Sequence, residues 1–359
     1  MKRMALAISM TMLTSLANAQ SSVQLYGLID VGIEYLNHAG ADNGNVTRMI
    51  GGNMAGSRWG LRGSEDLGGG TSAIFTLEAG FRPGTGASEI GGQSGRLFGR
   101  VATIGLQGGF GTLTVGRQSI VLNDVMFYYD PMAFSLYGLA TLDGKFFGRV
   151  DNSIKYQSPI LHGFSTSAYY TFGSDTVNGQ GQIPGDAKVG RAFGLSAQYI
   201  VGPLSLAAVY DQAYPTTIAL TNAGNVDKRL VVAGSYTIGG VKGFIGYRRL
   251  NSTVAGTDGV LANLIWTGLA YQVNPFLRLA GAVYDNEVVG TSAHPTSFVL
   301  NADYLLSKRT DVYASVSFVK NRSSGGVSSD AAVTGGADAL PPAPGTNQTG
   351  AVIGIRHRF

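Results

Sequence analysis

The chain has 359 residues, of which 13% are charged, with 26 Lys and Arg against 22 Asp and Glu and no cysteine. Zero cysteines exclude a disulfide framework and thiolate metal sites. No clustered basic face with a binding motif supports nucleic-acid binding, and no glycine-rich loop between a strand and a helix supports a nucleotide cofactor. Four histidines lie far apart, without an HExxH or HxxxH pair, so no metal site is expected; they are His38, His162, His294 and His357.

The first twenty residues have the form of a secretory signal peptide. Lys2 and Arg3 precede an apolar stretch over 4–16, and Ala17-Asn18-Ala19 has the small-x-small form of a cleavage site. We therefore expect residues 1–19 to be removed and 20–359 to form the mature chain, with 24 basic and 22 acidic side chains. The alternative, an N-terminal membrane anchor, is disfavoured because the run is shorter than the roughly 20 apolar residues that span a bilayer.

The mature sequence alternates with a period of two, which is the pattern of β-strands. In residues 23–35, Val23, Leu25, Ile29 and Ile33 share one face. The last residues do the same, with Ala351, Ile353, Ile355, His357 and Phe359 on one parity. The same alternation appears in 57–66, 73–81, 149–157 and 297–305. Helical periodicity is almost absent, so we predict an all-β chain.

The connections between these strands alternate between short turns rich in Gly, Pro and Asn and long polar loops. The long loops are expected at 38–51, 84–95, 119–148, 173–189, 213–227, 252–260, 287–295 and 322–348. This arrangement predicts about sixteen strands in an antiparallel up-and-down β-barrel. Closure is required because unpaired strand edges are costly in lipid. We therefore expect the last strand to pair with the first, from Val23 onward, and Phe359 to lie at a membrane interface.

A barrel of sixteen strands is too wide for its own side chains to fill. The apolar face of each strand must then point outward to lipid, and the polar face must line a water-filled pore. A soluble β-propeller or tandem sandwich is the competing interpretation. It would show blade-like repeats or domain linkers, and neither is visible.

Several segments resemble the trimeric general porins of Gram-negative outer membranes, in particular their beta-proteobacterial branch. They are SSVQLYGLIDVGIEY, SRWGLRGSEDLGGGTSAIFTLEAGF, FGRVATIGLQGGFGTLTVGRQ, RVDNSIKYQSP and the closing GIRHRF. The resemblance covers essentially the whole mature chain. It implies a sixteen-strand transmembrane barrel over 20–359, a homotrimer in outer-membrane lipid and lipopolysaccharide, passive diffusion of small hydrophilic solutes, and a third loop folded into the lumen. It also implies that the outer-membrane assembly machinery reads the terminal Phe359.

The third long loop, 119–148, is unusually aromatic for a segment that would otherwise stand in water. Loops of this length are normally functional or disordered, and its aromatic residues argue against disorder. We expect it to pack against the inner wall, bringing Asp124, Asp130 and Asp143 towards the pore. The alternative is that one of these acids merely caps a helical turn, as Asp130 before Pro131 would.

Arginines of the alternating strands must point inward, because an arginine facing lipid near the midplane costs a few kcal/mol. This applies to Arg58, Arg62 and Arg149. The resemblance adds Arg100 to Arg58 and Arg149 as constriction arginines, with Glu78 and most nearly Asp124 as the constriction acids. The alternative is that Arg58 and Glu78 form a wall ion pair with little effect on permeation. Because the arginines outnumber the local acids, we expect a modest preference for anions.

Two other functions are possible for an outer-membrane barrel: an enzyme, and a structural or adhesin protein. An outer-membrane enzyme is not expected, because no serine lies in a G-x-S-x-G elbow and the histidines fall mostly in loops or turns. A structural or adhesin barrel without significant conductance has a similar sequence pattern. Only a conductance measurement separates that alternative from a porin.

Overall fold

The computed structural model describes residues 22–88, 96–174, 182–222, 224–322, 331–335 and 338–359. The expected signal peptide lies outside these ranges. The strands are β1 (Ser22–Ala39), β2 (Gly44–Gly51), β3 (Arg58–Gly68), β4 (Thr71–Gly80), β5 (Val101–Gly108), β6 (Gly111–Ser119), β7 (Arg149–Gln157), β8 (Phe164–Thr171), β9 (Ala192–Val201), β10 (Leu204–Ala213), β11 (Val226–Ile238), β12 (Val241–Thr253), β13 (Val260–Gln272), β14 (Leu277–Val288), β15 (Thr296–Leu305), β16 (Thr310–Lys320) and β17 (Gln348–Arg358). The helices are α1 (Val121–Met126), η1 (Phe127–Tyr129), η2 (Leu139–Thr141), η3 (Gly144–Phe147) and α2 (Ile218–Asn222). No helix in the described ranges is long and apolar enough to cross a membrane.

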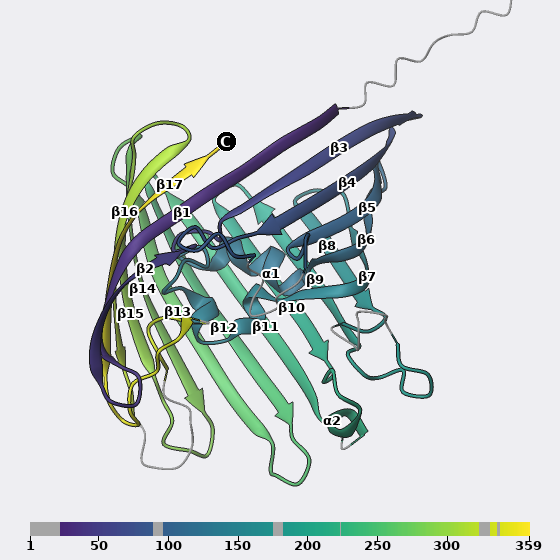
Figure 1. Ribbon diagram of the computed structural model, residues 1–359. Helices are drawn as coiled ribbons and strands as arrows, with labels where there is room; N and C mark the ends of the chain where they lie inside the picture. The colour runs from purple at the N-terminus through teal and green to yellow at the C-terminus, as the bar shows by residue number, and fades with distance from the viewer. Residues whose placement is uncertain (1–21, 89–95, 175–181, 223, 323–330, 336–337) are drawn as a thin grey trace, which may run out of the picture.

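The strands form one closed antiparallel barrel (Figure 1). β1 pairs with both β2 and β3, each strand from β3 to β16 pairs with the next in sequence, and β17 returns to pair with β1 from Leu28 to Leu36. β2 and β3 pair with successive stretches of β1 and together occupy one position in the barrel. The barrel therefore has sixteen strand positions. The expected architecture is confirmed. Closure satisfies the backbone groups that an open edge would leave unpaired.

The terminal residue completes this closure. The backbone N–H of Phe359 donates to the carbonyl oxygen of Gly27 at 3.0 Å, and the Gly27 N–H donates back at 3.1 Å. The Phe359 ring lies so close to Gly27 that a Cβ there would meet a ring carbon at 2.4 Å. Pairing of the two ends therefore begins at Gly27, opposite Phe359, and not at Val23. On its other edge β1 pairs with β3 over Ser22 to Leu28.

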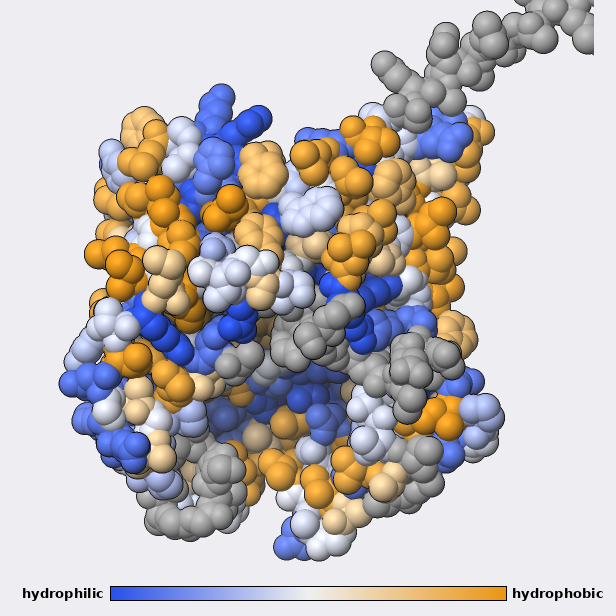
Figure 2. All heavy atoms as spheres, in the orientation of Figure 1, coloured by the Kyte–Doolittle hydropathy of each residue, from blue (hydrophilic) through white to orange (hydrophobic). Residues whose placement is uncertain are grey.

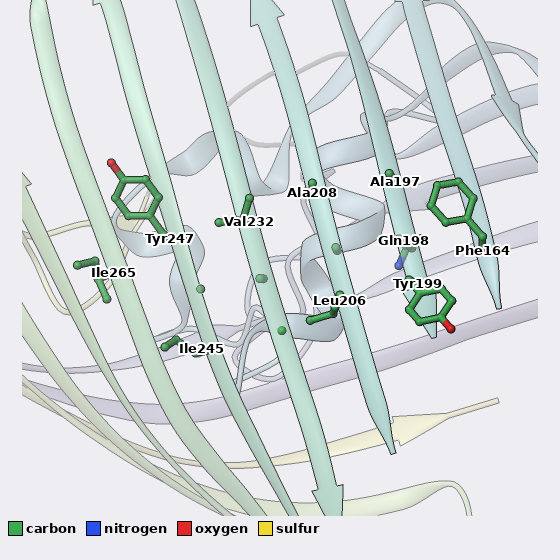
Figure 3. Close-up of a pocket in the computed structure, with 14 residues that line it drawn as sticks. Phe164, Ala197, Gln198, Tyr199, Leu206, Ala208, Val232, Ile245, Tyr247 and Ile265 are labelled. Atoms are coloured by element: carbon green, nitrogen blue, oxygen red, sulfur yellow. The ribbon is translucent and has the colours of Figure 1, made fainter. Parts of the chain in front are cut away.

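The outer surface is apolar, as the alternation predicts. Ile33 and Ile353 are 58% and 67% exposed, whereas Glu34 and Val352 beside them are buried inside. Figure 2 shows hydrophobic residues along the flanks of the barrel and hydrophilic residues in the hollow between the loops. On the outer face of β8 to β13, the small side chains Ala197 and Ala208 leave a shallow apolar groove between larger neighbours (Figure 3).

The connection between β6 and β7, residues 120–148, folds into the barrel, and we call it the lumen loop (Figure 1). It carries α1 and the three short 3₁₀ helices. Its buried side chains, such as Met126, Tyr129 and Phe146, pack against inner-wall residues of β10 to β14, such as Leu264 and Trp266. The inner wall is therefore apolar where the loop covers it, which corrects the expectation of a uniformly polar lining.

One expected loop is a strand for most of its length. Residues 44–51 fall within the loop expected at 38–51, but they form β2 and pair with β1. Only Gly40 to Asn43 make the turn. Val46, Thr47 and Ile50 favour the extended backbone, and pairing with β1 outweighs the glycines around them.

Candidate functional site

The lumen loop is fixed across the barrel by contacts at several points. The indole Nε1 of Trp266 donates to the carbonyl oxygen of Tyr129 at 2.9 Å, and Arg278 donates to the carbonyl oxygen of Pro131 at 3.0 Å. At the β1 side, the hydroxyl of Tyr137 donates to Glu34 at 3.1 Å. These contacts bind the loop to the wall on both sides of the lumen, so it narrows the passage.

Asp143 makes the strongest ionic anchor of the loop. Its carboxylate accepts from Nε and Nη2 of Arg229 at 2.9 and 3.2 Å, and Nε of Arg248 lies 3.3 Å away. All three side chains are more than nine-tenths buried. Burial by itself would raise the pKa of Asp143, but the charges of Arg229 and Arg248 hold that pKa below its ordinary value. The carboxylate stays ionised and ties the loop to β11 and β12.

Asp130 is buried within the lumen loop and does not face the pore. It is 2% exposed, and its carboxylate accepts from the backbone N–H groups of Met132, Phe134 and Leu139 and from the hydroxyl of Tyr284. Burial raises the pKa of this carboxyl, and those hydrogen bonds act in the opposite direction. These contacts favour the alternative given above, that Asp130 caps a turn and organises the backbone of the loop, over the expectation that it approaches the pore.

Arg58, Arg100 and Glu78 come together on the opposite wall. Nε of Arg100 lies 2.6 Å from Oε1 of Glu78, and Nε of Arg58 lies 3.4 Å from Oε2. The hydroxyl of Tyr26 donates to the same Oε2 at 3.0 Å. Arg62 stands over the ring of Tyr26, 5.2 Å from its centroid. The ion pair that sequence reasoning kept as an alternative is therefore present, but one carboxylate serves two guanidinium groups.

Arg149 begins β7 and is the least compensated of the predicted arginines. Its Nη1 donates to the carbonyl oxygen of Phe147 at 3.3 Å. Its buried Nε has no hydrogen-bond partner among the described residues, and no described acid forms an ion pair with it. Asp124 on α1 is engaged elsewhere, since its Oδ2 lies 2.7 Å from Nζ of Lys155.

Three basic residues that sequence reasoning missed belong to the same wall. Arg96 and Arg117 both contact Oδ1 of Asp151, at 2.6 and 2.5 Å, and the third is Lys155. Simple alternation places Arg117 outside with Val115. A bulge between Gly116 and Gln118, with Gly116 at φ +122°, breaks that alternation and lets Arg117 reach the inward-facing Asp151. The sequence signal that could have indicated this bulge is the glycine directly before Arg117 within the strand.

These residues form what we call the basic wall. Its members are the charged side chains described above on β3 to β7, the segments that adjoin them and α1. Seven of them are basic and three are acidic, an excess of four positive charges. The basic members are Arg58, Arg62, Arg96, Arg100, Arg117, Arg149 and Lys155, and the acidic members are Glu78, Asp124 and Asp151. Arginine suits such a surface because it stays charged at every working pH and offers several donors to carboxylate or phosphate.

Comparison with known proteins agrees with this architecture. The chain is 33% identical to an outer membrane porin protein of Bordetella pertussis, over 96% of each chain. Among solved structures, the anion-selective porin from Comamonas acidovorans superposes with a TM-score of 0.81 at 26% identity, covering 94% of this chain and 100% of that one. OmpT of Vibrio cholerae in its trimer form has the same fold, with a TM-score of 0.67 at 17% identity, covering 94% and 99%. The family described as Gram-negative porin matches residues 5–324. The chain therefore belongs to the Gram-negative porin family, whose members lie in the outer membrane.

Proposed function

We propose that this porin admits small hydrophilic solutes and ions by diffusion and that it prefers anions modestly. The observation that carries the preference is the excess of four positive charges on the basic wall, facing a lumen loop whose buried acid, Asp143, is already neutralised by two arginines. Low-dielectric walls focus the field of these charges into the passage. The anion-selective porin of Comamonas acidovorans supports the same sign.

The proposed working form is a homotrimer in the outer membrane. The trimer form of a protein with the same fold supports this state. We further propose that residues 1–19 are removed on export, that Phe359 is read by the assembly machinery, and that the apolar outer surface of the barrel contacts lipid and lipopolysaccharide. Unboiled protein in mild detergent is expected to migrate as a trimer, and a monomer by light scattering would contradict this proposal.

The selectivity is tested by single-channel recording in a planar bilayer under a potassium chloride gradient. Conductance in steps of three is expected, with a zero-current potential on the anion side. Replacing Arg58 and Arg149 together by Ser removes two of the excess positive charges, so this potential should move towards cation selectivity without loss of the trimer.

Arg249→Ser is the matched control. Arg249 is exposed, and its neighbour Arg248 faces inward and is 1% exposed, so Arg249 stands on the outer face of β12. Its loss should leave the potential unchanged. A wild-type channel that prefers potassium would show that the acids dominate, and a barrel without conductance would favour the structural or adhesin alternative.

A further inference from the structure

A second site lies inside the barrel, on the short-turn side of the lumen loop. It is a cavity of about 480 Å³, and we call it the vestibule pocket. The loop contributes Asp124, Phe127 and Tyr128 to it, and the wall contributes Gln157, Ser167 and Gln198 from β7, β8 and β9. Its volume is in the range of small-molecule sites. The pocket adjoins the basic wall, with which it shares Asp124 and Lys155.

The loop side of the vestibule pocket presents two aromatic rings to water. Tyr128 is 64% exposed and Phe127 is 43% exposed. Their rings meet edge to face, with centroids 5.4 Å apart. Both belong to η1 inside the barrel, so the strands separate them from lipid. Exposed ring surface in water is unfavourable, and a solute with an apolar face would cover it.

The wall side presents amide groups without partners. The side-chain amides of Gln157 and Gln198 and the hydroxyl of Tyr128 make no hydrogen bond within the described ranges. Gln157 pairs directly with Ser167, and Gln198 pairs with Ser165, one pleat away on the same face. Each amide offers both a donor and an acceptor. The groups therefore converge on one patch and are available to a solute.

The charges in the vestibule pocket compensate each other. Nζ of Lys155 lies 2.7 Å from Oδ2 of Asp124, and the hydroxyl of Ser119 donates to the other carboxylate oxygen. Lys155 and Asp124 also belong to the basic wall, but at the pocket their charges balance, whereas over the wall as a whole positive charge is in excess. A solute held here gains little from carrying a net charge of its own.

We propose that the vestibule pocket is a binding subsite for an uncharged saccharide of one or two rings. Such a solute combines hydroxyl groups, which donate and accept, with C–H faces that pack against an aromatic ring. Its hydroxyls would pair with Gln157 and Gln198, and one C–H face would cover Tyr128. The proposal rests on the proposed function, because the pocket is reached only through a water-filled channel.

The test measures the chloride current of the full-length trimer in a planar bilayer while glucose or maltose is added to both sides. A saturable fall in conductance with excess current noise is expected at millimolar sugar. Glycerol at equal osmolality, which lacks a ring face, should produce only the viscosity effect. Tyr128→Leu and Gln198→Leu should each weaken sugar binding and so raise the half-blocking sugar concentration about threefold to tenfold.

Two variants separate the pocket from a general effect of the loop. Phe147→Leu removes a ring that is 47% exposed on the same loop but does not line the pocket, so sugar block should be unchanged. Tyr128→Phe keeps the ring and should retain most of the block. If Tyr128→Leu does not yield folded trimer, Gln198→Leu tests the site from the barrel wall.

The outcomes distinguish this proposal from the proposed function. Normal chloride conductance without saturable sugar block overturns the saccharide subsite and leaves the channel intact. Block that is equal in wild type, Tyr128→Leu and Gln198→Leu places sugar binding elsewhere and also overturns it. Block by benzoate but not by sugars, lost in Tyr128→Leu, would assign the pocket to aromatic anions instead. Absence of any conductance refutes both proposals.

Discussion

Replacing Asp143 by Asn tests whether the lumen loop is held by its buried ionic anchor. The substitution keeps the size of the side chain and removes its charge. Arg248 is 1% exposed and would lose its only ion-pair partner among the described residues. Among the described residues, Arg229 would keep its ion pair with Asp227, at 3.2 Å from its Nη1, and the charge of the nearby Asp211; the side chain of Asp227 is 40% exposed.

The expected cost follows from the burial of the three groups. Removing one partner of a buried ion pair typically costs about 3 to 5 kcal/mol, because it leaves an uncompensated charge out of water. Since Arg229 keeps Asp227, we expect the lower end, about 3 kcal/mol. The barrel does not depend on this contact for its strand pairing. The cost should therefore appear as partial release of the loop, with its detached population rising by about a hundredfold.

The measurement is single-channel recording of Asp143→Asn trimers at constant voltage and about pH 7. A second conductance level should be occupied for about a hundred times more of the recording than in wild type. The temperature at which the trimer unfolds, followed on gels, should change little by comparison. The residual wall contacts of the loop, such as Trp266 to Tyr129, keep it mostly in place.

Asp227→Asn is the matched control, since it removes an acid from the same arginine. This acid is more than a third exposed, so its ion pair is worth only about 0 to 1 kcal/mol. The share of the recording spent at the second conductance level should then stay within a few-fold of wild type. If Asp143→Asn and Asp227→Asn behave alike, buried charge compensation does not hold the loop, and the apolar contacts alone do.

Three further predictions concern the same structure. Deletion of Phe359, or Phe359→Asp, should reduce folded, heat-modifiable protein in the outer membrane, whereas Phe359→Tyr should not; unchanged yields would contradict its role in closure. The pKa of Asp143 lies below its ordinary value, which is about 3.9 for an aspartate, so its stabilisation is complete above that pH and is lost as pH falls through the lower native pKa. Channel noise should accordingly stay constant from about pH 7 to about pH 4.5 and rise only in more acidic solution; a rise already at about pH 6 would point to another group. Anion preference at a fixed concentration ratio should weaken as salt rises from about 0.1 to 1 M, because the screening length falls from about 10 to 3 Å, and a constant reversal potential would show that the basic wall does not set the selectivity.

The sequence alone predicted the barrel and the direction in which its strands face. Alternation in stretches such as 23–35 and 351–359 reflects the two-residue period of an extended chain, which is a local property of the backbone. The last strand carries the pattern to Phe359, and this predicted the closure that the pairing of Phe359 with Gly27 confirms. The aromatic residues of the loop at 119–148 also predicted that this loop is largely buried, because exposing so many aromatic rings to water is unfavourable.

Positions of single charged groups in the site were less predictable. Arg58, Arg100 and Glu78 were named from alternation and resemblance, and they do lie together. Arg117 was missed because a bulge at Gly116 changes the register by one residue. Residues 44–51 were placed in a loop because pairing with β1, a contact with another segment, decides their conformation.

The roles of the loop acids were decided only by the tertiary structure. Asp124, Asp130 and Asp143 lie within twenty residues on one loop, with no local pattern that separates them. One pairs with Lys155, one accepts hydrogen bonds from the backbone of the loop, and one forms ion pairs with two arginines from β11 and β12. Which partner each acid meets depends on how the loop crosses the lumen and on the register in which sixteen strand positions close. Those are contacts between residues as far apart as Asp143 and Arg248, and a period of two carries no information about them.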